Sequence, residues 1–238
     1  MRRPTDVFRL VVFAVCCTFA AGAAAAAPGE KQLARVRGTV QYQTGPDAPY
    51  HRIVGRLELP DDAIAVTLAD SQGLLRFPDS SEIDIGARAR VRVGAFNALA
   101  NSGPNQTIAL DVGAVHFSVR HPAGGRTTYR FVTATTQIAV RGTEGYIVTG
   151  PRGTDFYCAS CGPGDVTMQV GARSIPLVTG QQVIVDLSKS GAGRTRVFKA
   201  PCSNPAAIAI SNGKLGRTIP RSQWVDTTGA LGADPLKS

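Results

Sequence analysis

Two cysteines separated by two residues, Cys158 and Cys161, are the feature of this chain that most resembles a chemical motif. They stand in the segment FYCASCGPGD, and a third cysteine, Cys202, lies well downstream. A Cys-x-x-Cys pair predicts a structural disulfide, half of a zinc site or a thiol redox pair. A disulfide would join Cys158 to Cys161, or one of them to Cys202, and the odd number leaves one thiol over.

The residues after the cysteine pair help to separate these readings. A redox pair of the thioredoxin type opens a helix, because the helix N-terminus lowers the thiol pKa. Here the sequence Gly-Pro-Gly follows at 162–164 and argues against a helix. A zinc site needs two more ligands, which Cys202 and one of the histidines would supply: His51, His116 or His121. The sequence favours a disulfide, with a thiol redox or metal-dependent enzyme built on Cys158, Cys161 and Cys202 as the alternative.

Three arginines at alternating positions, Arg88, Arg90 and Arg92, predict a cationic patch. We expect one strand over residues 82–93, in which side chains two residues apart point to the same side. Such a patch would bind the phosphate or carboxylate groups of a partner, since Arg holds them with two hydrogen bonds. The alternative is a solvated strand face whose charges protect a sheet edge.

No other pattern in the sequence indicates catalysis. There is no Gly-x-Ser-x-Gly motif and no glycine-rich loop before a helix. His116 shares the polar parity of its strand and His121 lies at a turn, so we expect both to be solvated. The pair Asp61-Asp62 fits a turn better than a cation site. We therefore expect a protein that is not an enzyme and holds no cofactor and no metal.

Short alternating segments between Gly and Pro turns indicate an all-β protein. Val115, Phe117 and Val119 alternate with polar residues, and the chain contains 26 Gly and 15 Pro. Many such strands predict a sandwich, a roll or a solenoid-like pair of sheets, and we expect the last of these. We expect the β domain at 30–199 and a short irregular or helical tail at 200–238, with a helix from Asn204-Pro205 to Ile210.

The N-terminal residues 1–27 have a basic start, an apolar stretch and an Ala-rich end, which is typical of a cleaved signal peptide. Cleavage would leave a periplasmic or secreted protein without a stable membrane span. The alternative is an inner-membrane anchor through residues 10–27. Net charge is +9, and the rest of the chain keeps +7 because the segment carries three Arg and one Asp. This surplus favours anionic partners, and an ordinary solvated basic surface is the alternative that explains it more simply. We expect an envelope protein or an anionic envelope polymer as partner and no nucleic acid.

Four segments together resemble the FecR domain family. The stretch GAVHFSV…YRFVTATTQIAVRGTEGYIV is similar to the core of that domain, and FPDSSEIDIG and LVTGQQV are similar to its flanking segments. The resemblance covers roughly residues 35–187. The positions that match the family motifs are Gly113, Phe117, Arg141, Gly142, Thr143 and Gly180.

The resemblance implies an all-β, non-enzymatic module that acts as a sensor, adaptor or ligand-binding protein. The best-known member of the family is a periplasmic sensor that relays iron uptake to a sigma factor. Only the short segment Met1–Arg9 precedes the apolar stretch here, so we expect this chain to lack the cytoplasmic anti-sigma region. The arginines and the bend at Gly142-Thr143 are the expected partner contacts.

Overall fold

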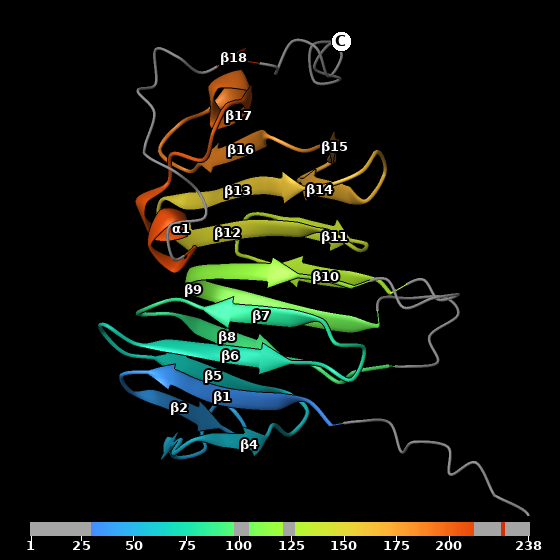
Figure 1. The fold of residues 1–238 in the computed structure, drawn as a ribbon. Coiled ribbons are helices and arrows are strands. Elements are labelled where there is room, and N and C mark those ends of the chain that lie inside the picture. The colour runs from blue at the N-terminus through green and yellow to red at the C-terminus, as the bar shows by residue number, and fades with distance from the viewer. Residues whose placement is uncertain (1–29, 98–104, 121–126, 212–224, 227–238) are drawn as a thin grey trace, which may run out of the picture.

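The structure is a computed structural model that describes residues 30–97, 105–120, 127–211 and 225–226. The predicted signal peptide at 1–27, His121 and most of the tail, including Trp224, lie outside the described residues. Within the described part the strands form two layers that rise from β2 and β4 at one end to β17 and β18 at the other (Figure 1). The all-β prediction is confirmed.

One layer, which we call sheet A, is built mostly of antiparallel neighbours. In spatial order it contains β4 (Arg56–Glu58), β1 (Gln32–Arg37), β6 (Gln72–Arg76), β7 (Glu82–Ile85), β9 (Gln106–Ser118), β12 (Glu144–Gly150), β13 (Gly153–Ser160), β16 (Gln181–Asp186), β17 (Thr195–Lys199) and β18 (Val225–Asp226).

The second layer, sheet B, lies against the first. Its spatial order is β3 (His51–Arg52), β2 (Val40–Gln43), β5 (Ala63–Thr67), β8 (Arg90–Val93), β9, β10 (Tyr129–Val132), β11 (Gln137–Val140), β14 (Val166–Val170) and β15 (Arg173–Leu177). A 3-10 turn, η1 (Gly191–Arg194), and one helix, α1 (Pro205–Ile210), complete the described elements. The chain alternates between the layers as it rises, which makes the stack solenoid-like.

Strand β9 joins the two sheets into one. Its first half pairs with β8 and β10 in sheet B, and its second half pairs with β7 and β12 in sheet A. Gly113 stands at the crossing with φ +110°, and a Cβ atom there would lie 2.4 Å from the Cβ of Ala89. Only glycine fits a site with both this backbone conformation and this close approach.

The main core lies between the two sheets. Phe117 of sheet A has its ring centroid 4.9 Å from that of Phe131 in sheet B and 6.1 Å from that of Phe156. All three side chains are fully buried. These aromatic rings hold the layers together at the middle of the stack, because each buries a large apolar area.

The strand predicted over residues 82–93 is wrong, because the structure has two strands there. β7 ends at Ile85 in sheet A, residues 86–89 cross to the other layer, and β8 starts at Arg90 in sheet B. Arg88 lies in the crossing with φ +54°. Each of the two strands buries one face, so apolar and polar residues alternate before and after the crossing. The sequence pattern therefore looks like one continuous strand.

The predicted helix in the tail is confirmed. α1 begins after Asn204, whose side-chain oxygen accepts hydrogen bonds from the backbone N–H groups of Ala206 and Ala207 at 3.0 and 3.4 Å. Pro205 occupies its first turn, where a missing N–H costs nothing. Among the described residues, no helix is long and apolar enough to cross a membrane.

Candidate interaction face

The outer face of sheet A, over β7, β9 and β12, carries a cluster of polar and aromatic side chains that lies apart from the main core. Helix α1 lies on this face, in contact with β9 and β12. In Figure 1 it stands beside β12 at the middle of the stack. The helix divides the face into a buried cluster and an open groove.

His116 is the centre of the buried cluster. Its Nδ1 lies 2.9 Å from Oδ2 of Asp84 on β7, and its Nε2 lies 2.9 Å from Oε1 of Glu144 on β12. The residue is 8% exposed, so the expectation of a solvated histidine is wrong. The strand register places Asp84 directly opposite His116, and this cross-strand pairing is not readable from residues 32 positions apart in the chain.

The two carboxylates govern the charge of this histidine. Burial is the largest single effect and lowers the pKa of His116, but the hydrogen bonds and charges of Asp84 and Glu144 together outweigh it. The pKa of His116 therefore lies above its ordinary value. A protonated imidazole donates to both carboxylates and ties β7, β9 and β12 together.

Tyr146 connects this cluster to the helix. It belongs to a small apolar cluster on the outer face with Cys202, Ala207 and Ile210. Burial raises the pKa of Tyr146 and raises that of the Cys202 thiol to about 11, so both stay neutral at physiological pH. Cys202 is a buried packing residue, separate from the cysteine pair.

The tail is also held by polar contacts next to this cluster. Asn204 Nδ2 donates to Oδ2 of Asp155 at 2.7 Å, and Gln182 Nε2 donates to both oxygens of Asp155 at 2.8 and 2.9 Å. These bonds and the apolar contacts of Ile210 hold α1 on the sheet. The described start of the tail is therefore packed against the β domain.

On its other side α1 borders a groove of about 450 Å³. The walls come from α1, from the middle of β9, from the end of β12 with its turn, and from the crossing at 86–88. The apolar lining includes Val112, Val148 and Ile210. Two arginines, Arg37 and Arg88, also line the groove, and none of the described residues in its lining is Asp or Glu.

The three arginines predicted to form one patch are separated by the structure. Arg88 reaches the groove on sheet A, whereas Arg90 and Arg92 lie on β8 of sheet B. Arg90 Nε lies 3.2 Å from Oδ2 of Asp111, and its guanidinium donates to Tyr50 at 2.9 Å. The patch is divided because the chain changes layers between Arg88 and Arg90.

Cys158 and Cys161 form a disulfide with Cα atoms 6.1 Å apart. Both residues are buried, and Thr143 Oγ1 donates to Sγ of Cys161 at 3.0 Å. The N–H of Gly180 donates to the carbonyl of Cys158 at 2.9 Å. Two motif positions thus contact the disulfide loop, and their role there is structural.

The alternative reading of the cysteines finds little support in this geometry. Cys161 is followed by a turn and then β14, so it does not open a helix. Across the described ranges, no group of three or more His, Cys, Asp or Glu side chains is placed to hold a metal ion. The disulfide sulfurs are buried, which limits access by a second thiol.

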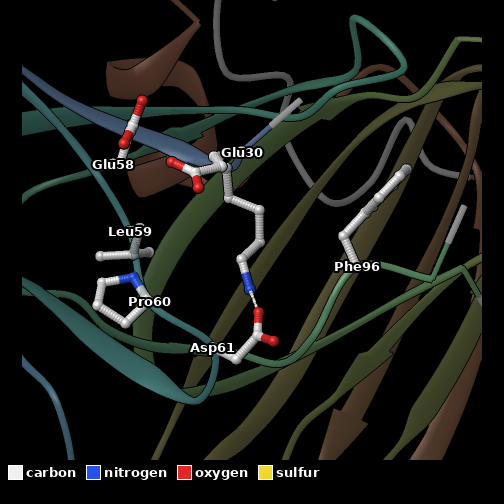
Figure 2. Close-up of a pocket in the computed structure, with 7 residues that line it drawn as sticks. Glu30, Glu58, Leu59, Pro60, Asp61 and Phe96 are labelled. Carbon is white, nitrogen blue, oxygen red and sulfur yellow. Dashed lines mark hydrogen bonds and ion pairs between the residues drawn. The ribbon is translucent and has the colours of Figure 1, made fainter. Parts of the chain in front are cut away.

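A second hollow, of about 440 Å³, lies at the N-terminal end of the stack (Figure 2). The buried Lys31 forms an ion pair with Asp61 and donates to the carbonyl of Gly94 at 2.8 Å. Gln106 Nε2 donates to the same carbonyl at 2.9 Å. Lys31 and Asp61 thus bind one part of the chain to another, so we assign this ion pair a structural role.

Comparisons with known proteins bear on the family resemblance of this chain. Residues 63–172 match the family model described as FecR protein. No curated protein matches the chain. Two crystal structures from Parabacteroides distasonis ATCC 8503, both described as a "putative anti-sigma factor", are similar to it at 13% identity and a TM-score of 0.49. Each likeness covers 64% of this chain and 64% or 65% of the other, and at this level it says nothing about activity or partners. The resemblance read from the sequence motifs is confirmed over residues 63–172, the part of the chain that matches the FecR family model.

Proposed function

We propose that this chain is an exported signalling or adaptor module that binds a protein partner in the bacterial envelope and has no chemistry of its own. The match of residues 63–172 to the FecR family carries the proposal. The basic, apolar and Ala-rich pattern of residues 1–27 supports export. The disulfide supports an oxidising compartment, where such bonds persist.

Gene deletion with two forms of complementation tests signalling and location together. Deletion is expected to change the transcription of a limited set of genes in the source bacterium. The full chain should restore the original pattern, and a chain without residues 1–27, kept in the cytoplasm, should not. No transcriptional change on deletion would contradict signalling, and rescue by the cytoplasmic form would contradict the proposed location.

Intact mass of the purified exported protein gives a second test of location. The expected mature chain starts at Ala27 or Pro28, and its mass increases by two hydrogens on reduction because the disulfide opens. A full-length chain in the inner membrane would instead support the anchored alternative.

A cysteine variant tests the absence of thiol chemistry. The double variant Cys158→Ala, Cys161→Ala should still restore the transcription pattern at a growth temperature where circular dichroism shows it folded. Loss of signalling in a folded double variant would favour a redox role for the pair.

A further inference from the structure

We propose that the groove beside α1 binds an extended peptide segment of a partner protein, a segment that is apolar and carries acidic side chains. The inference rests on the proposed function, because it assigns the surface by which the module holds its protein partner. The shape and charge of the groove give the occupant its apolar and acidic character, and the proposed function makes that occupant a segment of a protein.

The shape of the groove suits a short run of side chains. Its volume of about 450 Å³ lies in the range of sites that hold small ligands. Val112 is 39% exposed on its floor, and Ile210 of α1 forms part of a wall. Apolar side chains of a partner would remove this surface from water, which favours binding.

The charge of the groove specifies an acidic occupant. In the described part of the chain, the side chains of Arg37 and Arg88 have no ion pair and no hydrogen bond. By contrast, Arg90 only two residues away is paired with Asp111. Two arginines without carboxylate partners, among described lining residues that include no Asp or Glu, would attract carboxylates and bind them with two hydrogen bonds each.

The backbone at Arg88 adds to the argument. Its φ of +54° is a left-handed conformation that costs free energy for a residue with a side chain. The N–H of Arg88 donates to the carbonyl of Leu68 at 3.1 Å, which holds the turn in place. The turn thus keeps Arg88 beside the groove and away from the strand that carries Arg90 and Arg92.

Titration with defined peptides tests the proposal. The probe is an acetylated and amidated octapeptide in which Val or Leu alternates with Glu, labelled with a fluorophore for anisotropy. A second peptide with Gln in place of every Glu serves as the matched control. The exported chain should bind the Glu peptide at least about tenfold more tightly than the Gln peptide, and more weakly as salt rises, because carboxylates supply the charge contacts.

Variants locate the binding to the groove. The double variant Arg37→Gln, Arg88→Gln should weaken binding of the Glu peptide about tenfold or more. Ala209→Phe, on the exposed side of α1, should fill the groove and reduce binding to a similar degree. Arg130→Gln and Ala139→Phe make matched changes at exposed positions of β10 and β11 in sheet B and should leave the affinity unchanged.

Several outcomes would overturn the proposal. The Glu peptide could show no measurable binding, the Gln peptide could bind equally well, or Ala209→Phe could leave binding of the Glu peptide unchanged. A concentration-dependent dimer that Ala209→Phe abolishes would assign the groove to a second copy of the chain. Stronger binding to phosphatidylglycerol vesicles than to the peptide, with the same dependence on Arg37 and Arg88, would assign it to a lipid surface instead.

The transcription assay separates this inference from the proposed function. If the arginine double variant restores the transcription pattern in full, the signalling role stands and the groove is not the partner site. If deletion of the gene has no effect while the peptide binds as expected, the groove inference stands and the signalling role does not.

Discussion

The ring of Tyr146 lies on the ring of His116, with centroids 4.7 Å apart and planes at 29°. This stacking joins the ionic bridge across β7, β9 and β12 to the apolar cluster under α1. A tyrosine ring attracts a cation over its face, so the contact favours the protonated imidazole that the two carboxylates also favour. Charge at His116 is thereby linked to the packing of the tail.

The first prediction concerns pH and His116. Its pKa in the folded state lies above the ordinary value of 6.5, so the folded protein binds this proton more tightly than the unfolded chain. The stabilisation is complete below the unfolded pKa and is lost as pH rises through the folded pKa. Between about pH 5.5 and about pH 8.5, the stability advantage of the wild type over His116→Gln should therefore shrink as pH rises.

Urea unfolding of both proteins across this range measures the effect. At the acidic end His116→Gln should be less stable by about 1 kcal/mol, since Asp84 and Glu144 lose their shared cation but remain partly solvated. An advantage that stays constant or grows with pH would show that His116 is not held as the cation.

The second prediction concerns the strand that crosses between sheets. Gly113→Ala should destabilise the protein by about 3 kcal/mol or more, or prevent folding, because the new Cβ would meet Ala89 and the backbone has φ +110°. Gly150→Ala is the matched control, since nothing lies within 4 Å of a Cβ there and its φ is not positive. Thermal unfolding compares them, and similar losses at both sites would contradict the crossing geometry.

The third prediction concerns the disulfide. The exported chain should show one free thiol, Cys202, under denaturing conditions before reduction and three after it. Replacing Cys158 and Cys161 by Ala should lower the free energy of unfolding by about 2 kcal/mol, because the closed loop is short. Three free thiols in the oxidised protein would contradict the bond, and titration with a thiol reagent decides.

The fourth prediction concerns the helix cap. Asn204→Ala removes the cap of α1 and the hydrogen bond to Asp155, so it should cost about 1–2 kcal/mol. Amide hydrogen exchange in α1 should become faster. Ser190→Ala is the control, because Ser190 precedes η1 without a side-chain cap bond. Unchanged exchange in α1 after Asn204→Ala would show that other contacts hold the helix.

Local patterns in the sequence were sufficient to predict several features of the protein. Alternating residues predicted the strands, Asn204-Pro205 predicted the helix start, and four motif segments predicted the FecR domain. Each of these depends on residues close together in the chain. The break at residues 86–89 was missed, because a strand that changes layers keeps its alternation on both sides.

The interaction face could not be predicted from local sequence patterns. His116 alternates with the core residues of β9, so the sequence places it on the outer face of the sheet. The sequence does not show which residues cover that face. Its burial depends on Asp84 and Glu144, 32 and 28 positions away, and on Tyr146, which carries the tail. The division of the arginines likewise depends on which sheet each strand joins.

By itself the sequence determined the all-β class, the likeness to FecR domains and the capped helix, because propensity, alternation and motif order are properties of neighbouring residues. Only the tertiary structure decided that His116 is a buried ionic bridge, that Cys158 pairs with Cys161, and that Arg88 belongs to a groove that Arg90 does not reach. These depend on strand register and on the crossing at residues 86–89, which bring together side chains that the chain itself keeps apart.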